Sequence, residues 1–178
     1  ADGFSAGGDI DCGLAGTVMR FVPPVAALGS TRVTFDGDPR ARERPMSGTI
    51  AGLRSLGVKV EDEDRGTLPF TVVGEGGVAG GRVEVDASSS SQFVSALLLV
   101  GARFRDGLDL RHTGAVLPSQ PHIDMTVTEL RRRSVTIDSG PGRWTIHPGP
   151  IASLDATIEP DLSNAGGYVA AALVTGGR

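Results

Sequence analysis

Residues Phe93 to Gly101 read Phe-Val-Ser-Ala-Leu-Leu-Leu-Val-Gly, and the pattern of this stretch occurs three times in the chain. Each copy has an aromatic-valine pair and, eight residues after the aromatic, a glycine, with small and aliphatic residues between them. The copies begin about 75 residues apart. Small polar residues suited to a helix N-cap precede each copy, and the closing glycine suits the C′ position of a helix. We therefore expect three helices, over 21–29, 93–101 and 168–176, preceded by Thr17, by Ser90 and Ser91, and by Ser163 and Asn164.

Further matching segments follow the first two copies. A strand comes first, then a helix with proline near its first turn, then two more strands. Such a fixed period indicates a fold built from repeated units, here with the order helix, strand, helix, strand, strand. We expect Phe70 and Trp144 to be core residues and Pro23-Pro24 to kink or restart the first helix. The predicted strands are 31–35, 58–60, 70–73, 108–112, 135–137 and 144–147, and the second helices open at Arg44-Pro45 and Gln120-Pro121.

The third copy has no matching strands after it in this sequence. A single helix cannot bury its apolar face by itself, and the chain opens on Ala1-Asp2-Gly3, with no initiator methionine or secretion signal. We therefore expect an internal fragment of a longer protein. The segment from Pro148 to Asp161 has little pattern of its own and suits a domain boundary or hinge.

Composition excludes several classes of function. The net charge is −4 and the sequence has no basic face with interleaved aromatic residues, so we expect no nucleic-acid partner. The longest apolar run, 93–102, is about half of the roughly twenty residues that a membrane span requires, so we expect no membrane partner. The single Cys12 excludes a disulfide framework or a cysteine metal cluster and favours the cytoplasm. Because Asp11 adjoins it, we expect this thiol to be inert.

The stretch from Asp11 to Phe21 is the first candidate site. Gly13, Ala15 and Gly16 leave the backbone almost bare, and we expect Thr17 to cap a helix that begins at Val18. Unpaired amides at such a helix start can bind a phosphate or carboxylate. Arg20 would add a fixed cation. The alternative is an ordinary glycine-rich turn that leads into a core helix.

Three other loops interrupt the repeat. The loop 36–45 holds three arginines at alternate positions, which would point the same way if the loop is extended, and Glu43 could pair with one of them. The loop 86–93 places hydroxyls and an amide at a helix start, where they could bind a phosphate or sugar hydroxyls. The loop 117–122 has turn chemistry. The alternative for the loop 36–45 is a solvated basic loop, and the alternative for the loop 86–93 is a serine-rich cap without a ligand. We expect His112 and His147 to be structural.

Five motifs resemble the 5-enolpyruvylshikimate-3-phosphate (EPSP) synthase family, in the family's order and across nearly the whole chain. The resemblance implies an α/β fold of repeated βαβαββ units, the inverted α/β barrel-like domain of the enolpyruvate transferases. It also implies that 1–158 is most of the first domain and 159–178 the beginning of a truncated second domain. The motifs are Gly-Leu-Ala-Gly-Thr-Val-Met-Arg (13–20), Asp-Gly-Asp-Pro-Arg-Ala-Arg-Glu-Arg-Pro (36–45), Ser-Ser-Gln-Phe (90–93), Pro-Ser-Gln-Pro-His-Ile-Asp (118–124) and Glu-Pro-Asp-Leu-Ser-Asn-Ala (159–165).

The activity that the resemblance implies is enolpyruvyl (carboxyvinyl) transfer. Such an enzyme joins phosphoenolpyruvate to the 5-hydroxyl of shikimate 3-phosphate and releases phosphate, in the cytoplasm, on the shikimate pathway to chorismate and the aromatic amino acids. The full-length enzyme would be a monomer. Residue by residue, the resemblance implies phosphoenolpyruvate-binding positions at Gly16, Arg44 and Gln92, and shikimate-3-phosphate-binding positions at Ser90, Ser91, Gln92, Ser119 and His122.

Three residues depart from the family pattern. Leu14 replaces a common asparagine, Phe21 replaces a common proline, and Ser134 stands where a helix-ending glycine is usual. His122 stands where relatives often have tyrosine. Because of the first two departures, the resemblance does not determine the backbone path beside Gly16.

No catalytic acid or base is assigned within this chain, so we expect the fragment alone to be inactive. No cofactor is implied, because the sequence has no metal cluster or nucleotide fingerprint. Two alternatives stay open: a transferase that acts on UDP-N-acetylglucosamine, and a non-catalytic phosphate-binding α/β domain. The Ser-Ser-Gln-Phe motif and the absence of a reactive-cysteine loop stand against the first of these.

Overall fold

The computed structural model describes residues 7–158 and 162–177, and it contains two copies of one unit followed by a helix. The first unit consists of β1 (Gly8–Asp11), α1 (Gly16–Ala26), β2 (Arg32–Asp36), α2 (Pro39–Arg42), α3 (Ser47–Ser55), β3 (Lys59–Glu61) and β4 (Phe70–Val73). The second consists of β5 (Gly81–Val85), α4 (Gln92–Gly101), β6 (Leu108–His112), α5 (Gln120–Arg132), β7 (Ile137–Gly140) and β8 (Arg143–Ile146), and α6 (Leu162–Thr175) follows.

Each unit forms one mixed four-stranded sheet. The strand order is β1-β2-β4-β3 in the first and β5-β6-β8-β7 in the second. In both, the first two strands are parallel, because a helix connects them, and the other pairs are antiparallel. The predicted βαβαββ fold is therefore confirmed, and its sheet order is the same in both copies.

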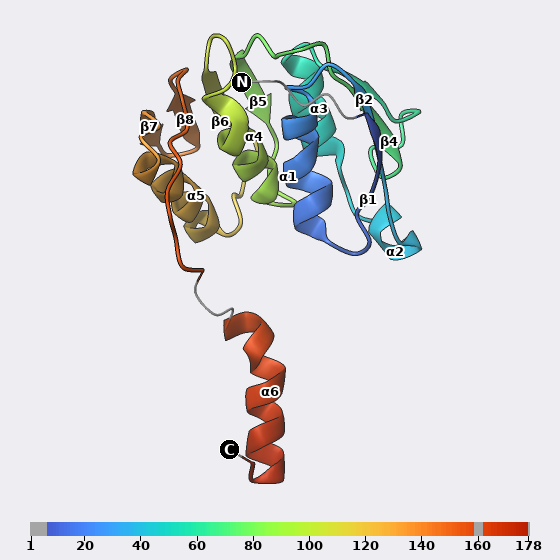
Figure 1. The fold of residues 1–178 in the computed structure, drawn as a ribbon, viewed down its shortest axis with the longest axis vertical. Helices are drawn as coiled ribbons and strands as arrows, with labels where there is room; N and C mark the ends of the chain where they lie inside the picture. The colour runs from blue at the N-terminus through green and yellow to red at the C-terminus, as the bar shows by residue number, and fades with distance from the viewer. Residues whose placement is uncertain (1–6, 159–161, 178) are drawn as a thin grey trace.

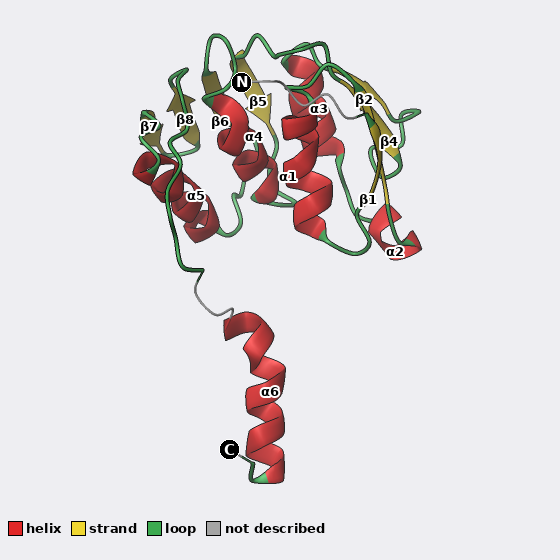
Figure 2. Cartoon of the chain, viewed as in Figure 1, coloured by secondary structure: helices red, strands yellow, loops and turns green. Residues whose placement is uncertain are grey.

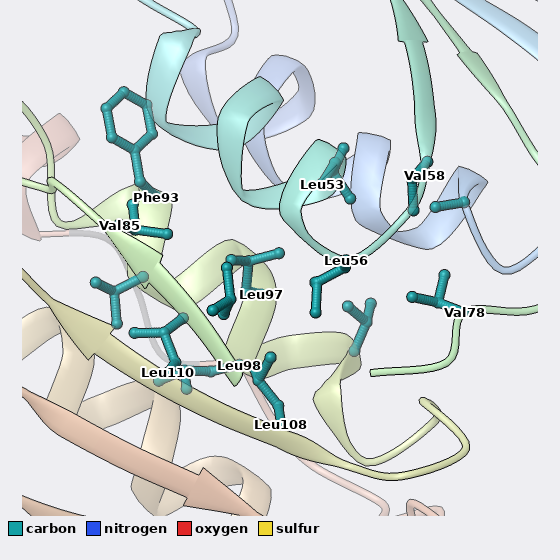
Figure 3. Packing of buried hydrophobic residues seen from close by; sticks show 14 of the residues in the cluster. Leu53, Leu56, Val58, Val78, Val85, Phe93, Leu97, Leu98, Leu108 and Leu110 are labelled. Atoms are coloured by element: carbon teal, nitrogen blue, oxygen red, sulfur yellow. The ribbon is translucent and has the colours of Figure 1, made fainter. Parts of the chain in front are cut away.

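The core lies where the helices of the two units meet. The helices α1 and α4 pack side by side, and α4 also contacts α3, α5 and the second sheet. Figure 2 shows the helices of both units gathered together, with the strands of the two sheets toward opposite sides of the body. In Figure 3, Leu97 and Leu98 of α4 pack among residues of α3, β5 and β6.

The predicted core positions of the closing strands are confirmed. Phe70 and Trp144 are almost fully buried. Phe70 stands opposite Phe35 on β2 and stacks on it, with 5.3 Å between ring centroids. In the second unit Trp144 stands opposite Leu110 in the same register position. The aromatic residue on the closing strand is therefore a repeated core element.

Periodicity alone missed the first strand of each unit. β1 has only four residues, two of them aspartates, and its side chains are mostly exposed. β5 does alternate between exposed and buried positions, with Val83 and Val85 inward. That period of two could have been found. The segments predicted for the remaining strands form strands, with boundaries shifted by one to three residues in four of the six.

The first helix differs from the prediction in two ways. It begins at Gly16, and the N-cap is Ala15, which is extended and makes no side-chain hydrogen bond, so Thr17 is not the cap. The helix also continues through Pro23 and Pro24 without restarting. Two consecutive prolines remove two amide donors, but the following turn is closed by donation from the Ala27 amide to the carbonyl of Pro23.

The closing glycines do not all have the predicted role. Only Gly176 has the left-handed φ, +67°, of a C′ residue. Gly101 lies inside α4, where a Cβ would come within 2.9 Å of Ile146 and 3.1 Å of Leu108. Its small size therefore permits close packing of α4 on the second sheet. Gly29 follows α1 without a left-handed φ, and Pro45 precedes α3, which begins at Ser47.

The loops after α3 and α5 give a stability prediction. Gly57 and Ser134 both have a left-handed φ, +84° and +64°, and an L side chain is strained there. We expect Gly57→Ala to lower the free energy of unfolding by about 1 kcal/mol, and Ser134→Gly to raise it by about 0.5 kcal/mol after the extra freedom of the unfolded glycine is subtracted. Urea unfolding of both variants measures these changes, and changes of the same sign would contradict the account.

The helix α6 follows the residues 159–161, which are not described, and it extends away from the two sheets (Figure 1). It carries exposed apolar side chains, including Tyr168, Leu173 and Val174. The predicted caps Ser163 and Asn164 have side chains outside the described residues. None of the described helices is both long and apolar enough to cross a membrane.

Candidate functional site

The first part of the site is the open start of α1. The preceding turn is fixed at both ends, because the Gly13 amide donates to Asp11 Oδ1 at 2.8 Å and the Gly13 carbonyl accepts from the Asp38 amide at 3.1 Å. With Ala15 extended, the first amide of the helix that pairs is that of Met19, which donates to the Ala15 carbonyl. The amides of Gly16, Thr17 and Val18 have no acceptor among the described residues. Three free amides at a helix start can bind an anion.

Arg44 lies directly over this helix start. A Cβ built on Gly16 would be 2.5 Å from Nη2 of Arg44 and 2.9 Å from its Nη1, and Nη1 also donates to the carbonyl of Leu14 at 3.2 Å. Only glycine leaves room for this approach. The structure thus brings together Gly16 and Arg44, two residues twenty-eight positions apart for which the resemblance implied one ligand.

The loop that carries Arg44 is not extended, contrary to the prediction. Pro39 to Arg42 form the short helix α2, since Asp38 accepts a hydrogen bond from the Arg40 amide and proline suits a first helical turn. The three arginines therefore point in different directions. Arg42 makes a two-point contact with Asp36, at 2.8 and 2.7 Å, and this donation lowers the pKa of Asp36. The partner is Asp36 rather than Glu43.

Arg20 connects this helix start to the second unit. It is only 5% exposed, and its Nη1 donates to Oε1 of Gln92 at 2.6 Å. Its Nη2 donates to the carbonyl of Pro45, next to Arg44, at 3.3 Å. Burial lowers the pKa of Arg20, and the nearby charge of Arg44 lowers it further. Two guanidinium groups therefore face one region, which is the electrostatic setting for an anionic ligand.

The second part of the site is a cavity between α1, α4 and α5. It has a volume of about 400 Å³, and its lining includes Ser91, Gln92 and His122, three of the predicted ligand-binding residues. Ser91 is buried, and its hydroxyl makes no hydrogen bond with the described residues. The Ser90 hydroxyl instead accepts from the Gln92 amide at 3.3 Å, so Ser90 helps to start α4.

Ser119 lies at the start of α5 but not in the lining of this cavity. Its backbone is left-handed, with φ +53°, and its side chain makes no capping hydrogen bond. A non-glycine residue held in this conformation stores strain of about 1 kcal/mol or more. Ser119 is therefore exposed and strained. It precedes α5, the helix that contributes His122 to the cavity lined by Ser91 and Gln92.

The remaining titratable candidates contact groups within the fold. Burial, and then the charges of Asp11 and Asp36, raise the pKa of Cys12 to about 11, so the thiol stays protonated. His112 Nδ1 accepts from the amide of Ala87, and His147 pairs with Asp138 on the neighbouring surface. Among the described side chains, no group of three or more histidine, cysteine, aspartate or glutamate residues is placed to bind a metal ion.

Comparison with known proteins identifies the family. The model of the EPSP synthase family, described as 3-phosphoshikimate 1-carboxyvinyltransferase, matches residues 4–178. The chain belongs to the EPSP synthase family. It is thus a member of the enolpyruvyl transferases. Gly16 at the open helix start and Arg44 above it lie in two of the five motifs by which the sequence resembles the family.

Solved structures of EPSP synthase agree with the fold. Two structures of EPSP synthase from Acinetobacter baumannii match with TM-score 0.68 and 21% identity, over 84% of this chain and 32% of theirs. The enolpyruvyl transferase NikO from Streptomyces tendae matches with TM-score 0.48 and 13% identity, over 74% of this chain and 29% of its own. The chain thus spans about a third of the length of these structures.

Sequence reasoning left several residues of the site unassigned. Arg20 was noted as a cation but not as a partner of Gln92, although an arginine on a mostly apolar helix without an acidic residue was a usable signal. The cavity lining also includes Thr17, Phe21, Ser95, Thr126 and Glu129. Phe21, which departs from the pattern of the EPSP synthase family, therefore contributes to the cavity wall.

Proposed function

We propose that this chain is part of a 3-phosphoshikimate 1-carboxyvinyltransferase, which transfers the enolpyruvyl group of phosphoenolpyruvate to the 5-hydroxyl of shikimate 3-phosphate and releases phosphate. Residues 1–158 would be most of its first domain and 159–178 the beginning of its second. The observation that carries the proposal is the arrangement of Arg44 over Gly16, beside three amides that have no acceptor in the described structure. This is a site for a small, multiply charged anion.

The two substrates are assigned to adjacent halves of the site. Phosphoenolpyruvate would bind the backbone amide of Gly16, the guanidinium of Arg44 and the side-chain carboxamide of Gln92. Shikimate 3-phosphate would bind Gln92 from the other side. Gln92 lies where the helix start meets the cavity, since it pairs with Arg20 and lines the cavity with Ser91 and His122. The proposed contacts of shikimate 3-phosphate are Ser90, Ser91, Gln92, Ser119 and His122.

The contribution of this chain is binding and orientation. The reaction needs a proton delivered to the methylene carbon of phosphoenolpyruvate and one removed from the attacking hydroxyl. The described groups that meet at the helix start are amides and guanidinium groups, which donate hydrogen bonds and neutralise charge. Holding both substrates in a reactive geometry can supply several kcal/mol of the barrier. We propose that the enzyme serves chorismate and aromatic amino-acid biosynthesis in the cytoplasm, as a monomer.

Product formation tests the function. Phosphorus NMR of the full-length enzyme, mixed with phosphoenolpyruvate and shikimate 3-phosphate, is expected to show inorganic phosphate and an enolpyruvyl product in equal amounts. UDP-N-acetylglucosamine in place of shikimate 3-phosphate is expected to give neither. If product forms with UDP-N-acetylglucosamine but not with shikimate 3-phosphate, the protein is the alternative transferase that acts on the sugar nucleotide. No product from either acceptor would support a non-catalytic phosphate-binding domain.

Arg44→Lys tests the assignment of phosphoenolpyruvate. A lysine keeps the charge but loses the two-point geometry of guanidinium. Since a charge-assisted hydrogen bond contributes about 1.5 to 3 kcal/mol, we expect the KM for phosphoenolpyruvate of the full-length enzyme to rise about ten- to a hundredfold. The KM for shikimate 3-phosphate should change less than threefold. Arg40→Lys, in an exposed arginine of the same loop, is the control and should leave both constants unchanged. Equal increases in both KM values for Arg44→Lys would contradict the assignment.

A further inference from the structure

Arg20 is buried without an ion-pair partner in the described structure. It is 5% exposed, and its Nε has no hydrogen-bond acceptor. The groups that it contacts are neutral: the Gln92 amide oxygen, the Pro45 carbonyl, and the ring of Phe93, whose centroid lies 5.4 Å from the guanidinium carbon. A buried charge without a counter-charge is costly, and most surface arginines in this chain do have acidic partners. Stability therefore does not explain why arginine stands here.

The contact with Gln92 does explain it. A glutamine side chain has one acceptor, Oε1, and one donor group, Nε2, on opposite sides of its carboxamide, whereas arginine can only donate. The 2.6 Å contact from Arg20 Nη1 therefore admits one orientation of the amide, with Oε1 toward Arg20. Nε2 must then face away from Arg20. It has no acceptor among the described residues, and Gln92 lines the cavity with Ser91 and His122.

We propose that Arg20 is a positioning residue that fixes the carboxamide of Gln92 so that its Nε2 donor faces the substrates. The inference rests on the proposed function. The second contact of Arg20 supports this role, because its Nη2 donates to the carbonyl of Pro45, the residue that follows Arg44. One buried guanidinium thereby sets the relative position of α1, the Arg44 loop and the start of α4.

The test is a double-mutant cycle in the full-length enzyme. We expect Arg20→Met to lower kcat/KM for phosphoenolpyruvate about ten- to a hundredfold in the wild-type background. In the Gln92→Ala background the same substitution should lower it less than threefold, because the group that Arg20 orients is already absent. Arg20→Lys keeps a donor and should recover part of the loss. Arg32→Met, which removes an exposed arginine paired with Glu61, is the control and should leave kcat/KM unchanged.

A second variant separates orientation from folding. Gln92→Glu keeps an oxygen for Arg20 but removes the Nε2 donor, so the enzyme should be at least as stable to urea and yet lose activity as Gln92→Ala does. If Arg20→Met does not fold, Arg20→Lys completes the same cycle. Equal losses in the two backgrounds would overturn the positioning role, while a wild-type enzyme that makes product would leave the proposed function intact. A wild-type enzyme without product would reject the proposed function first.

Discussion

Gly16→Ala is expected to weaken phosphoenolpyruvate binding strongly and to leave the fold unchanged. The added methyl group would lie 2.5 Å from Nη2 of Arg44, so the guanidinium must move out to a normal contact distance of about 3.5 Å. The end of an arginine side chain moves easily. Gly16 is the first residue of α1 and has no left-handed φ, so alanine fits its backbone.

The loss should fall on one substrate. Displacing Arg44 removes its alignment with the free amides of α1, and we expect the KM for phosphoenolpyruvate of the full-length enzyme to rise about ten- to a hundredfold. The KM for shikimate 3-phosphate should stay within threefold, and the urea midpoint should not shift. The matched control is Gly13→Ala, at a neighbouring glycine with open space around it but a left-handed φ of +50°, which should instead cost stability. An unchanged KM for phosphoenolpyruvate in Gly16→Ala would contradict the account.

Gly48→Ala is expected to have the opposite profile, a large loss of stability. A Cβ on Gly48 of α3 would overlap the ring of Phe93, which is rigid and only 1% exposed. Overpacking of this kind costs about 1 to 3 kcal/mol, more than the gain in helix propensity from glycine to alanine. Phe93 also lies under the Arg20 guanidinium, so the site should be disturbed as well.

Gly52→Ala is the matched control, because it lies in the same helix and receives the same gain in helix propensity. Its Cβ would be 3.0 Å from the end of the Leu97 side chain, which can shift more easily than a buried ring. Urea unfolding should therefore give a clearly larger loss for Gly48→Ala than for Gly52→Ala. A Gly48→Ala variant as stable as the wild type would show that α3 and α4 do not pack as closely as described.

The repeat made most of the fold predictable. Aromatic residues such as Phe70 and Trp144 recur at equivalent positions, because each unit must bury the same face of its closing strand. The first strand of each unit was harder to predict from the sequence. β1 is short, exposed and rich in aspartate, and it forms a strand because its backbone pairs with β2, a long-range effect that no local pattern reports.

The site was predictable in its residues but not in its connections. The glycine-rich turn and the serine loop each indicated an anion-binding segment, and the resemblance assigned Gly16, Arg44 and Gln92 to one ligand. The contact of Arg20 with Gln92 spans seventy-two positions, and only the packing of α1 on α4 creates it. The helix α2 was missed because its cap, Asp38, outweighs the extended conformation that the alternating arginines suggested.

The most direct test of the central claim is a crystal structure of the full-length enzyme with shikimate 3-phosphate and phosphoenolpyruvate, or an unreactive analogue of the latter. The account predicts an anionic group of phosphoenolpyruvate within hydrogen-bond distance of the Gly16 amide and the Arg44 guanidinium. It also predicts Nε2 of Gln92 as a donor to the ligands and shikimate 3-phosphate in contact with Ser91. Phosphoenolpyruvate bound away from Gly16 and Arg44, with the start of α1 left empty, would contradict it.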